Sequence, residues 1–75
     1  MSAPTEIAIK DSSIRLGQLL KLSGLATDGG EARAALETGD VTVDGETETR
    51  RGAQIRPGQV VRYGDEAIRV VAPGV

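Results

Sequence analysis

The sequence predicts an α+β fold in which two packed helices lie against a small, mostly antiparallel sheet. Leucine and alanine recur at helical spacing through residues 15–38. After residue 39 the pattern changes to short segments of alternating polar and apolar residues, separated by glycine-containing turns. Because one short chain carries both patterns, residues 1–75 are expected to form a single domain around one core.

The N-terminal part is predicted to contain one strand and the first helix. Residues 1–5 are expected to form a loose tail, and residues 6–10 alternate as a half-buried strand does. Side-chain oxygens in residues 11–13 are suited to cap the helix that follows. That helix is predicted from Arg15 to Ser23, and its buried stripe consists of Leu16, Leu19 and Leu20.

Glycines are predicted to end both helices. Gly24 stops the first helix in a left-handed conformation, and Leu25 supplies the hydrophobic contact that follows. The second helix starts near residues 28–30, where Asp28 and Glu31 have the spacing of a capping box. It ends at Thr38, before Gly39. Its buried stripe is predicted to be Ala32, Ala35 and Leu36.

The C-terminal half is predicted to form the sheet. Strands are expected at residues 41–43, 46–50, 59–63 and 67–71, and the chain is expected to leave the last strand at Pro73 and Gly74. The Asp44-Gly45 pair is a strong signal for a two-residue hairpin turn. Pro57-Gly58 and Gly64-Asp65 indicate two further turns, and Ile55 is predicted to be a core residue.

Composition excludes most catalytic and metal chemistry. The chain has no Cys and no His, which removes thiolate nucleophiles, imidazole bases and ordinary zinc sites. The carboxylates around the hairpin are expected to lie in water, where their pKa values are hard to tune. We therefore expect a non-catalytic binding protein without metal or cofactor. No signal peptide or membrane-length apolar run is visible, so a soluble, cytoplasmic protein is expected.

The charge balance alone argues against a nucleic-acid ligand. Nine Lys and Arg residues face eleven Asp and Glu residues, which gives a net charge of −2. The arrangement differs from the total, since acidic residues dominate residues 40–48 and Arg50, Arg51 and Arg56 follow them. A polarised surface of this kind can still present one cationic face.

Several short motifs occur in a characteristic order. The helical half contains Arg15-Leu16, Leu20, Gly29-Gly30, Ala32, Leu36 and Gly39. The hairpin half contains Val41-Thr42-Val43-Asp44-Gly45, Glu48-Thr49-Arg50-Arg51-Gly52 and Pro57-Gly58. Together they span residues 14–63 and resemble the S4 RNA-binding domain, in particular its short stand-alone bacterial branch.

The resemblance implies a fold known as the alpha-L motif and binding of structured RNA, either rRNA or tRNA. It implies phosphate contacts through a basic face formed by both helices and the segment after the hairpin. Carried over by position, the candidate RNA-binding residues are Arg15, Lys21, Gly29, Gly30, Arg33, Arg50, Arg51 and Gln54. The chain departs from the family at Asp28-Gly29, where Ser-Arg is common, at Asp44, where Asn is usual, at Gln54, where Lys is usual, and at Gly58-Gln59, where Gly-Asp is usual.

Each of these residues also has a purely structural interpretation. Arg50 and Arg51 would then neutralise Glu46 and Glu48, and Gly29-Gly30 would only give the chain a flexible entry to the helix. Tyr63, the one aromatic residue, is interpreted as a core-edge residue rather than a base-stacking platform.

The alternative function is a protein-interaction module that keeps the fold but has weak or no RNA binding. It would act through an apolar strand edge near Val70-Val71 or through Val75. In either case we expect a monomer, because no large apolar patch is evident.

Overall fold

The computed structural model describes residues 3–73, and the buried side chains among them form one aliphatic cluster. Its members are Ile9, Leu16, Leu19, Leu20, Ala26, Ala32, Ala35, Leu36, Val41, Ile55, Val61, Ile68 and Val70. Both predicted helical stripes and the predicted core position Ile55 are confirmed. No polar side chain within the described residues is buried. Each fully buried leucine or valine stabilises the fold by about 1.5–3 kcal/mol before entropy is counted.

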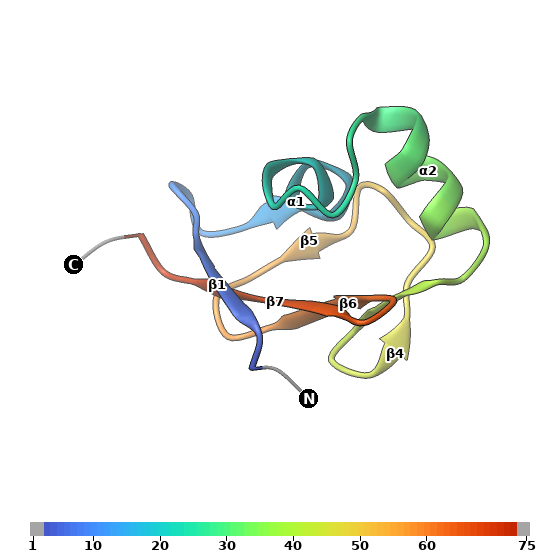
Figure 1. The fold of residues 1–75 in the computed structure, drawn as a ribbon. Coiled ribbons are helices and arrows are strands. Elements are labelled where there is room, and N and C mark those ends of the chain that lie inside the picture. Colours follow the sequence, from blue (N-terminus) through green and yellow to red (C-terminus); the bar gives the residue numbers. More distant parts are fainter. Residues whose placement is uncertain (1–2, 74–75) are drawn as a thin grey trace.

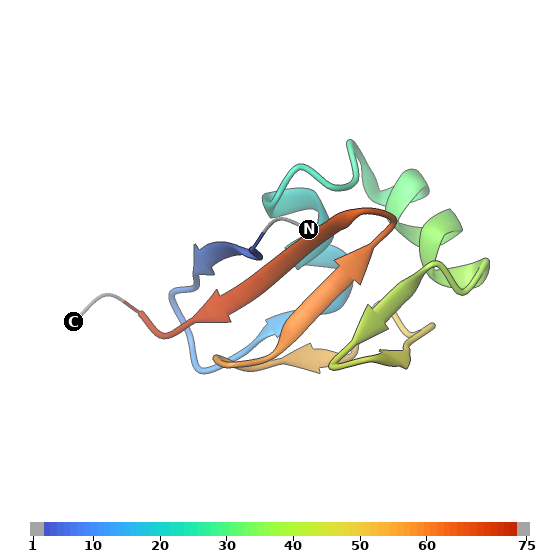
Figure 2. The same ribbon diagram turned by 60° about the horizontal axis from the view of Figure 1, so that its bottom comes forward.

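The main sheet has five strands in the order β1-β7-β6-β3-β4. The strands are β1 (Thr5–Ala8), β3 (Val41–Val43), β4 (Glu46–Thr47), β6 (Val60–Tyr63) and β7 (Glu66–Val71). β1 pairs with β7 in parallel, and every other neighbouring pair is antiparallel. Figure 2 shows β7 between β1 and β6. The expected tail was wrong at Thr5, which lies in β1. Residues 3–4 form neither helix nor strand, as predicted, while residues 1–2 and Gly74 lie outside the described residues.

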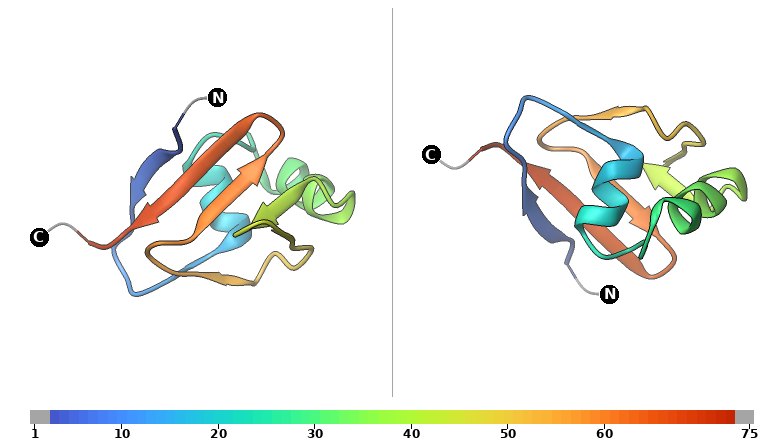
Figure 3. Two further views of the ribbon diagram at one scale, coloured as in Figure 1. Left: turned by 90° about the horizontal axis from the view of Figure 1, so that it is seen from below. Right: turned by 90° about the horizontal axis from the view of Figure 1, so that it is seen from above.

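Both helices lie on the same side of this sheet (Figure 1). They are α1 (Leu16–Leu22) and α2 (Gly29–Glu37). Seen from above, α1 lies over the strands, and α2 lies beside it, towards β3 and β4 (Figure 3). Gly24 and Gly39 follow the helices with φ angles of 82° and 78°, so both predicted glycine stops are confirmed. The two helices also contact each other.

The N-terminus of α2 is capped by half of the predicted capping box. The Asp28 carboxylate accepts a hydrogen bond of 2.8 Å from the backbone N–H of Glu31, as a capping Asp does. The Glu31 carboxylate, however, accepts from the hydroxyl of Thr27 at 2.7 Å. The cap of α2 is thus a side-chain oxygen with a negative charge.

The N-terminus of α1 is held differently from the prediction. A two-stranded pair, β2 (Ile14–Arg15) and β5 (Gln54–Ile55), precedes it, so Arg15 is a strand residue and the N-cap, without a side-chain cap bond. The expected capping by residues 11–13 was therefore wrong. The first helical N–H groups instead donate to a distant loop: Leu16 to the carbonyl oxygen of Ala53 at 2.8 Å and Gly17 to that of Arg51 at 3.0 Å.

The hairpin turn forms as predicted, but the return strand is shorter. Asp44 and Gly45 have φ angles of 51° and 87°, the left-handed values that a two-residue hairpin turn requires. The strand expected over 46–50 ends at Thr47. The Glu48 carboxylate accepts the backbone N–H groups of Thr49 and Arg50, which removes these donors from the sheet. Residues 48–53, called loop 48–53 below, then run back to α1.

The segment at Val70-Val71, one of the two surfaces expected for the alternative function, does not lie at an edge of the sheet. β7 is an inner strand, paired on both sides, and Val70 is fully buried. The expectation of an exposed edge at Val70-Val71 was therefore wrong, and Val75 lies outside the described residues. Across residues 3–73, no helix is long and apolar enough to cross a membrane.

Candidate nucleic-acid interface

One open groove collects residues from three segments that are far apart in the sequence. It has a volume of about 490 Å³ and lies where the exposed face of α1, the start of α2 and loop 48–53 meet. Its lining consists of Arg15, Gly17, Gln18, Lys21, Gly29, Ala32, Arg51 and Gly52. We call this surface the basic groove, because three of its side chains are cationic and none is a carboxylate.

The groove is assembled by the backbone contact between α1 and loop 48–53. Arg15 comes from the end of β2 and Lys21 from the last turn of α1. Arg51 joins them because its carbonyl oxygen accepts the N–H of Gly17. A Cβ atom placed on Gly17 would lie 3.4 Å from the Cβ of Arg51, an ordinary van der Waals contact, so the loop lies directly against the helix at this point.

The three cations of the groove have no ion-pair partner within the described residues. The ion pairs there are Arg33–Glu37 and Arg50–Glu48, and neither involves Arg15, Lys21 or Arg51. All three groove cations are exposed. Arginine and lysine side chains offer only hydrogen-bond donors, so the charge and the hydrogen-bonding capacity of this surface both favour an anion.

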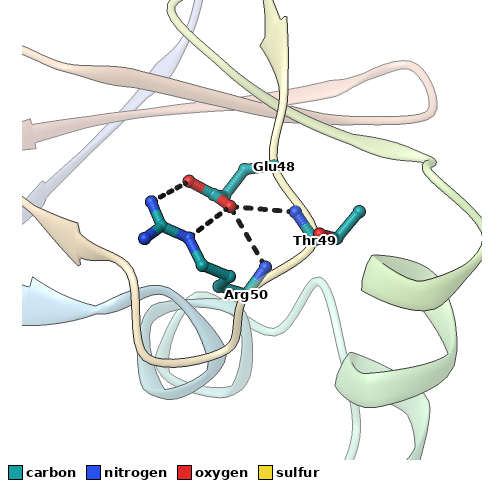
Figure 4. A network of polar contacts seen from close by, with 3 residues as sticks. All are labelled: Glu48, Thr49 and Arg50. Atoms are coloured by element: carbon teal, nitrogen blue, oxygen red, sulfur yellow. Dashed lines mark hydrogen bonds and ion pairs between the residues drawn. The ribbon is translucent and has the colours of Figure 1, made fainter.

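Arg50 is directed to a carboxylate rather than to the groove (Figure 4). Its Nε and Nη2 atoms donate to the Glu48 carboxylate at 3.2 and 3.1 Å. The same carboxylate accepts the backbone N–H groups of Arg50 and Thr49. The Arg50 side chain, the Arg50 N–H and its positive charge together lower the pKa of Glu48 to about 2, with a smaller contribution from the Thr49 N–H. The structural interpretation of a charge pair with Glu48 therefore holds for Arg50 but not for Arg51.

Arg33 also has a partner, on its own helix. Its Nε donates to Glu37 at 2.7 Å across one turn of α2, with both side chains more than 60 % exposed (66 % and 61 %). Gly29 lines the groove, whereas Gly30 does not, and a Cβ atom on Gly30 would lie 3.3 Å from the Asp28 carboxylate. The predicted residues thus fall into two sets: Arg15, Lys21, Gly29 and Arg51 lie together, while Gly30, Arg33 and Arg50 lie outside the groove.

Gln54 lies beside the groove without lining it. It is the cross-strand partner of Arg15 in the β2–β5 pair, and directly opposed residues project to the same face of a sheet. Both side chains are exposed. The position where an S4 domain usually has lysine is therefore adjacent to one of the three groove cations.

The acidic residues of the hairpin gather on a different surface. A shallow hollow beside β4 is lined by Val43, Asp44, Glu46, Thr47, Glu48 and Gln59. The Asp44 carboxylate accepts the N–H of Val60 at 2.9 Å and the side-chain amide of Gln59 at 3.4 Å. A net charge of −2 is thus compatible with a cationic groove, because the hairpin carboxylates lie on another surface.

Four residues of the groove were not among the sequence candidates: Gly17, Gln18, Ala32 and Gly52. A glycine inside a helical pattern is a signal for close backbone approach, and Gly17 is such a glycine. Gln18 carries no comparable signal. Tyr63 is half-buried and packs against the core, which confirms its interpretation as a core-edge residue.

The chain is similar to known proteins over most of its length. The S4 domain family matches residues 7–71. The protein YbcJ of Escherichia coli (strain K12) is 40% identical over 63 residues, which is 84% of this chain and 90% of YbcJ. The same values hold for YbcJ of Shigella flexneri.

Two solved structures share the fold. The solution structure of YbcJ from E. coli, described as revealing an ALFAL motif involved in RNA-binding, has a TM-score of 0.72 at 37% identity. The match covers 96% of this chain and 92% of that one. The 30S ribosomal protein S4e from Thermoplasma acidophilum has a TM-score of 0.61 at 30% identity over 80% of this chain, which spans about a third of S4e (32%). The predicted resemblance and the alpha-L fold are thus confirmed, and the chain belongs to the S4 domain family.

Proposed function

We propose that this S4 domain binds structured RNA through the basic groove. The observation that carries the proposal is the convergence of Arg15 from β2, Lys21 from α1 and Arg51 from loop 48–53 on one groove whose lining contains no carboxylate. Arg15 and Arg51 belong to two different family motifs, and the fold is what brings them together with Lys21. The YbcJ structure, with its motif involved in RNA-binding, supports the same class of ligand.

Recognition would depend on phosphate charge and on the shape of the groove. The arginine and lysine side chains fix the register of the RNA backbone, since they donate to phosphate oxygens and carry no acceptor. Gly29 and Gly52 leave the main chain open at the groove, as no atom beyond their own stretch of chain lies within 4 Å of the Cβ position of either residue. Folded or duplex RNA suits such a surface better than splayed single strands, which are bound mainly by aromatic stacking.

The RNA that we propose is cytoplasmic rRNA or tRNA, bound by a monomer. The structural relative S4e is a protein of the 30S ribosomal subunit, which favours rRNA. Arg33, Arg50, Gly30 and Gln54 would act at the margin of the contact, where Arg33 and Arg50 must share their charge with Glu37 and Glu48. Their individual contributions should be smaller than those of the groove cations.

The test is fluorescence anisotropy with labelled rRNA and tRNA fragments over a salt series. The matched variants are Arg51→Ala in the groove and Arg62→Ala, an exposed arginine on β6 that faces away from the helices because its neighbour Val61 faces the core. With three phosphate contacts, log Kd should change with log salt with a slope of about 3. Arg51→Ala should weaken binding about tenfold and reduce the slope by about 1, while Arg62→Ala should change little.

Three outcomes would count against the proposal. Equal losses in both variants would show that binding follows total charge rather than the groove. Binding that does not depend on salt would exclude the phosphate mechanism. No binding even at low salt would favour the protein-interaction module instead.

A further inference from the structure

Gln18 differs from every other side chain that lines the basic groove. The groove contains three cations, three glycines, one alanine and this single amide. Gln18 is exposed, and within the described residues its side chain makes no hydrogen bond. It lies on α1 between Arg15 and Lys21, three residues from each, so it is placed along the line that a bound backbone would follow.

The Gln18 amide can both donate and accept a hydrogen bond, so it can recognise a hydroxyl group in a way that the groove cations cannot. Arginine and lysine only donate, and phosphates only accept, so these contacts are the same for RNA and DNA. The Oε1 atom of Gln18 is the one side-chain acceptor on the described groove surface, and its Nε2 atom is a donor. A ribose 2′-hydroxyl is both donor and acceptor, and it is the group by which a protein tells RNA from DNA.

We propose that Gln18 is the specificity-determining residue of the groove and reads a ribose 2′-hydroxyl beside the phosphates held by Arg15 and Lys21. This inference rests on the proposed function, because it assigns a role within the same site. It separates two tasks on one surface: the cations supply attraction to any nucleic-acid backbone, and Gln18 supplies the preference for ribose.

The experiment compares two probes that share sequence and A-form geometry. One is an RNA hairpin with a duplex stem, and the other is the same hairpin with 2′-fluoro in place of every 2′-hydroxyl, which removes the donor. Kd is measured for both by anisotropy with the wild-type protein, Gln18→Ala and Gln18→Met. Since Gln18 is exposed and both replacements are good helix formers, the variants should keep the fold, which circular dichroism checks.

Arg62→Ala is the control, because Arg62 is an exposed polar residue on β6 that does not line the groove. The wild-type protein should prefer the hydroxyl probe about three- to tenfold, as expected for one hydrogen bond. Both Gln18 variants should lose this preference while their affinity for the fluoro probe stays unchanged. Arg62→Ala should retain the preference.

The outcomes separate this inference from the proposed function. Tight binding of both probes with no preference in the wild-type protein overturns the role of Gln18 and leaves RNA binding by the groove intact. A Gln18→Ala variant that weakens both probes equally overturns it as well. If neither probe binds, and the fragments of the salt series do not bind either, the proposed function fails and this inference fails with it.

Discussion

The backbone N–H of Gly17 donates a hydrogen bond of 3.0 Å to the carbonyl oxygen of Arg51. This contact joins the first turn of α1 to loop 48–53 and gives the basic groove its third cation. It also replaces a side-chain cap, since an otherwise unsatisfied helical N–H finds its acceptor in a distant segment. The placement of a functional arginine and the start of a helix are therefore set by the same bond.

Substitutions of Gly17 should separate helix stability from groove geometry. In Gly17→Ala the new Cβ would lie 3.4 Å from the Cβ of Arg51, an ordinary contact, and alanine favours the helix by up to about 1 kcal/mol. We expect equal or higher thermal stability and RNA affinity within about twofold of wild type. The larger Gly17→Val should push loop 48–53 away and weaken binding severalfold in anisotropy. Equal affinity of the two variants would show that the position of the loop does not matter.

Leu20 and Leu22 offer a matched pair on α1. Leu20 is fully buried, whereas Leu22 is 60 % exposed. Leu20→Ala should lower the free energy of unfolding by about 2–5 kcal/mol, because it removes buried methyl groups and leaves a cavity. Leu22→Ala should stay within about 0.5 kcal/mol of wild type. Urea denaturation measures both, and a large loss in Leu22→Ala would indicate a contact that the fold does not show.

The Asp28 carboxylate should stabilise the fold but weaken RNA binding, because its negative charge repels phosphate. Its carboxylate caps α2 and lies next to Gly29, which lines the groove. Asp28→Ser keeps a capping oxygen without the charge, so stability should change by less than about 0.5 kcal/mol and RNA affinity should rise severalfold. Asp28→Ala should gain the same affinity but lose about 1 kcal/mol of stability. A drop in affinity in Asp28→Ser, measured by anisotropy, would contradict this arrangement of charges.

Glu48 should make the fold sensitive to acid. Its pKa is lowered to about 2 in the folded protein from an ordinary value of 4.5, so the fold favours the ionised form. The resulting stabilisation is fully present above pH 4.5 and is lost as the pH falls from 4.5 to 2. In Glu48→Gln the free energy of unfolding should be lower than wild type at pH 7 and should converge with it near pH 2.

Arg50→Ala provides the control for Glu48. It should reproduce only part of the effect, because the backbone N–H groups of Thr49 and Arg50 still donate to the carboxylate. Urea titrations at several pH values measure the difference from wild type. A constant difference between wild type and Glu48→Gln over pH 2–7 would exclude the lowered pKa.

Asp44 should tolerate asparagine but not alanine. Its φ of 51° is left-handed, a conformation that Asn and Asp adopt readily and that costs other L-residues about 1–2 kcal/mol. Asn also keeps an oxygen for the N–H of Val60. Asp44→Asn should therefore remain near wild-type stability, and Asp44→Ala should lose about 1–2 kcal/mol in urea denaturation. Similar losses in both variants would show that the charge, rather than the turn, is what matters.

The parts of the fold that the sequence predicted are those with a local cause. The helical stripes follow from apolar spacing within one element, as at Leu36, and the turn at Asp44-Gly45 follows from residues that accept positive φ. The missed β2–β5 pair has only two residues in each strand, too few for a period to show. It depends on pairing between distant segments, which no local window contains.

The candidate site shows the same limit at the level of single side chains. Arg50 and Arg51 are adjacent and identical in type, yet Glu48 binds the first and leaves the second in the groove. Residue type predicted a basic face, but which arginine lines the groove depends on the short-range ion pair of Arg50 with Glu48 and on the long-range bond from Gly17 to Arg51. Gln18 was missed because an isolated glutamine gives no signal in the sequence, and only the fold places it in a groove with three cations.

The hydrogen bonds between α1 and loop 48–53 also couple ligand binding to folding. A peptide of residues 14–22 would carry Arg15 and Lys21 but not Arg51, so the three cations come together only in the folded chain. An RNA that engages all three must bind the native state in preference to the unfolded ensemble. At a free RNA concentration a hundred times Kd, this linkage adds about 2.7 kcal/mol to the stability of the domain. Bound RNA would then contribute directly to the stability of a fold whose buried core consists of aliphatic side chains.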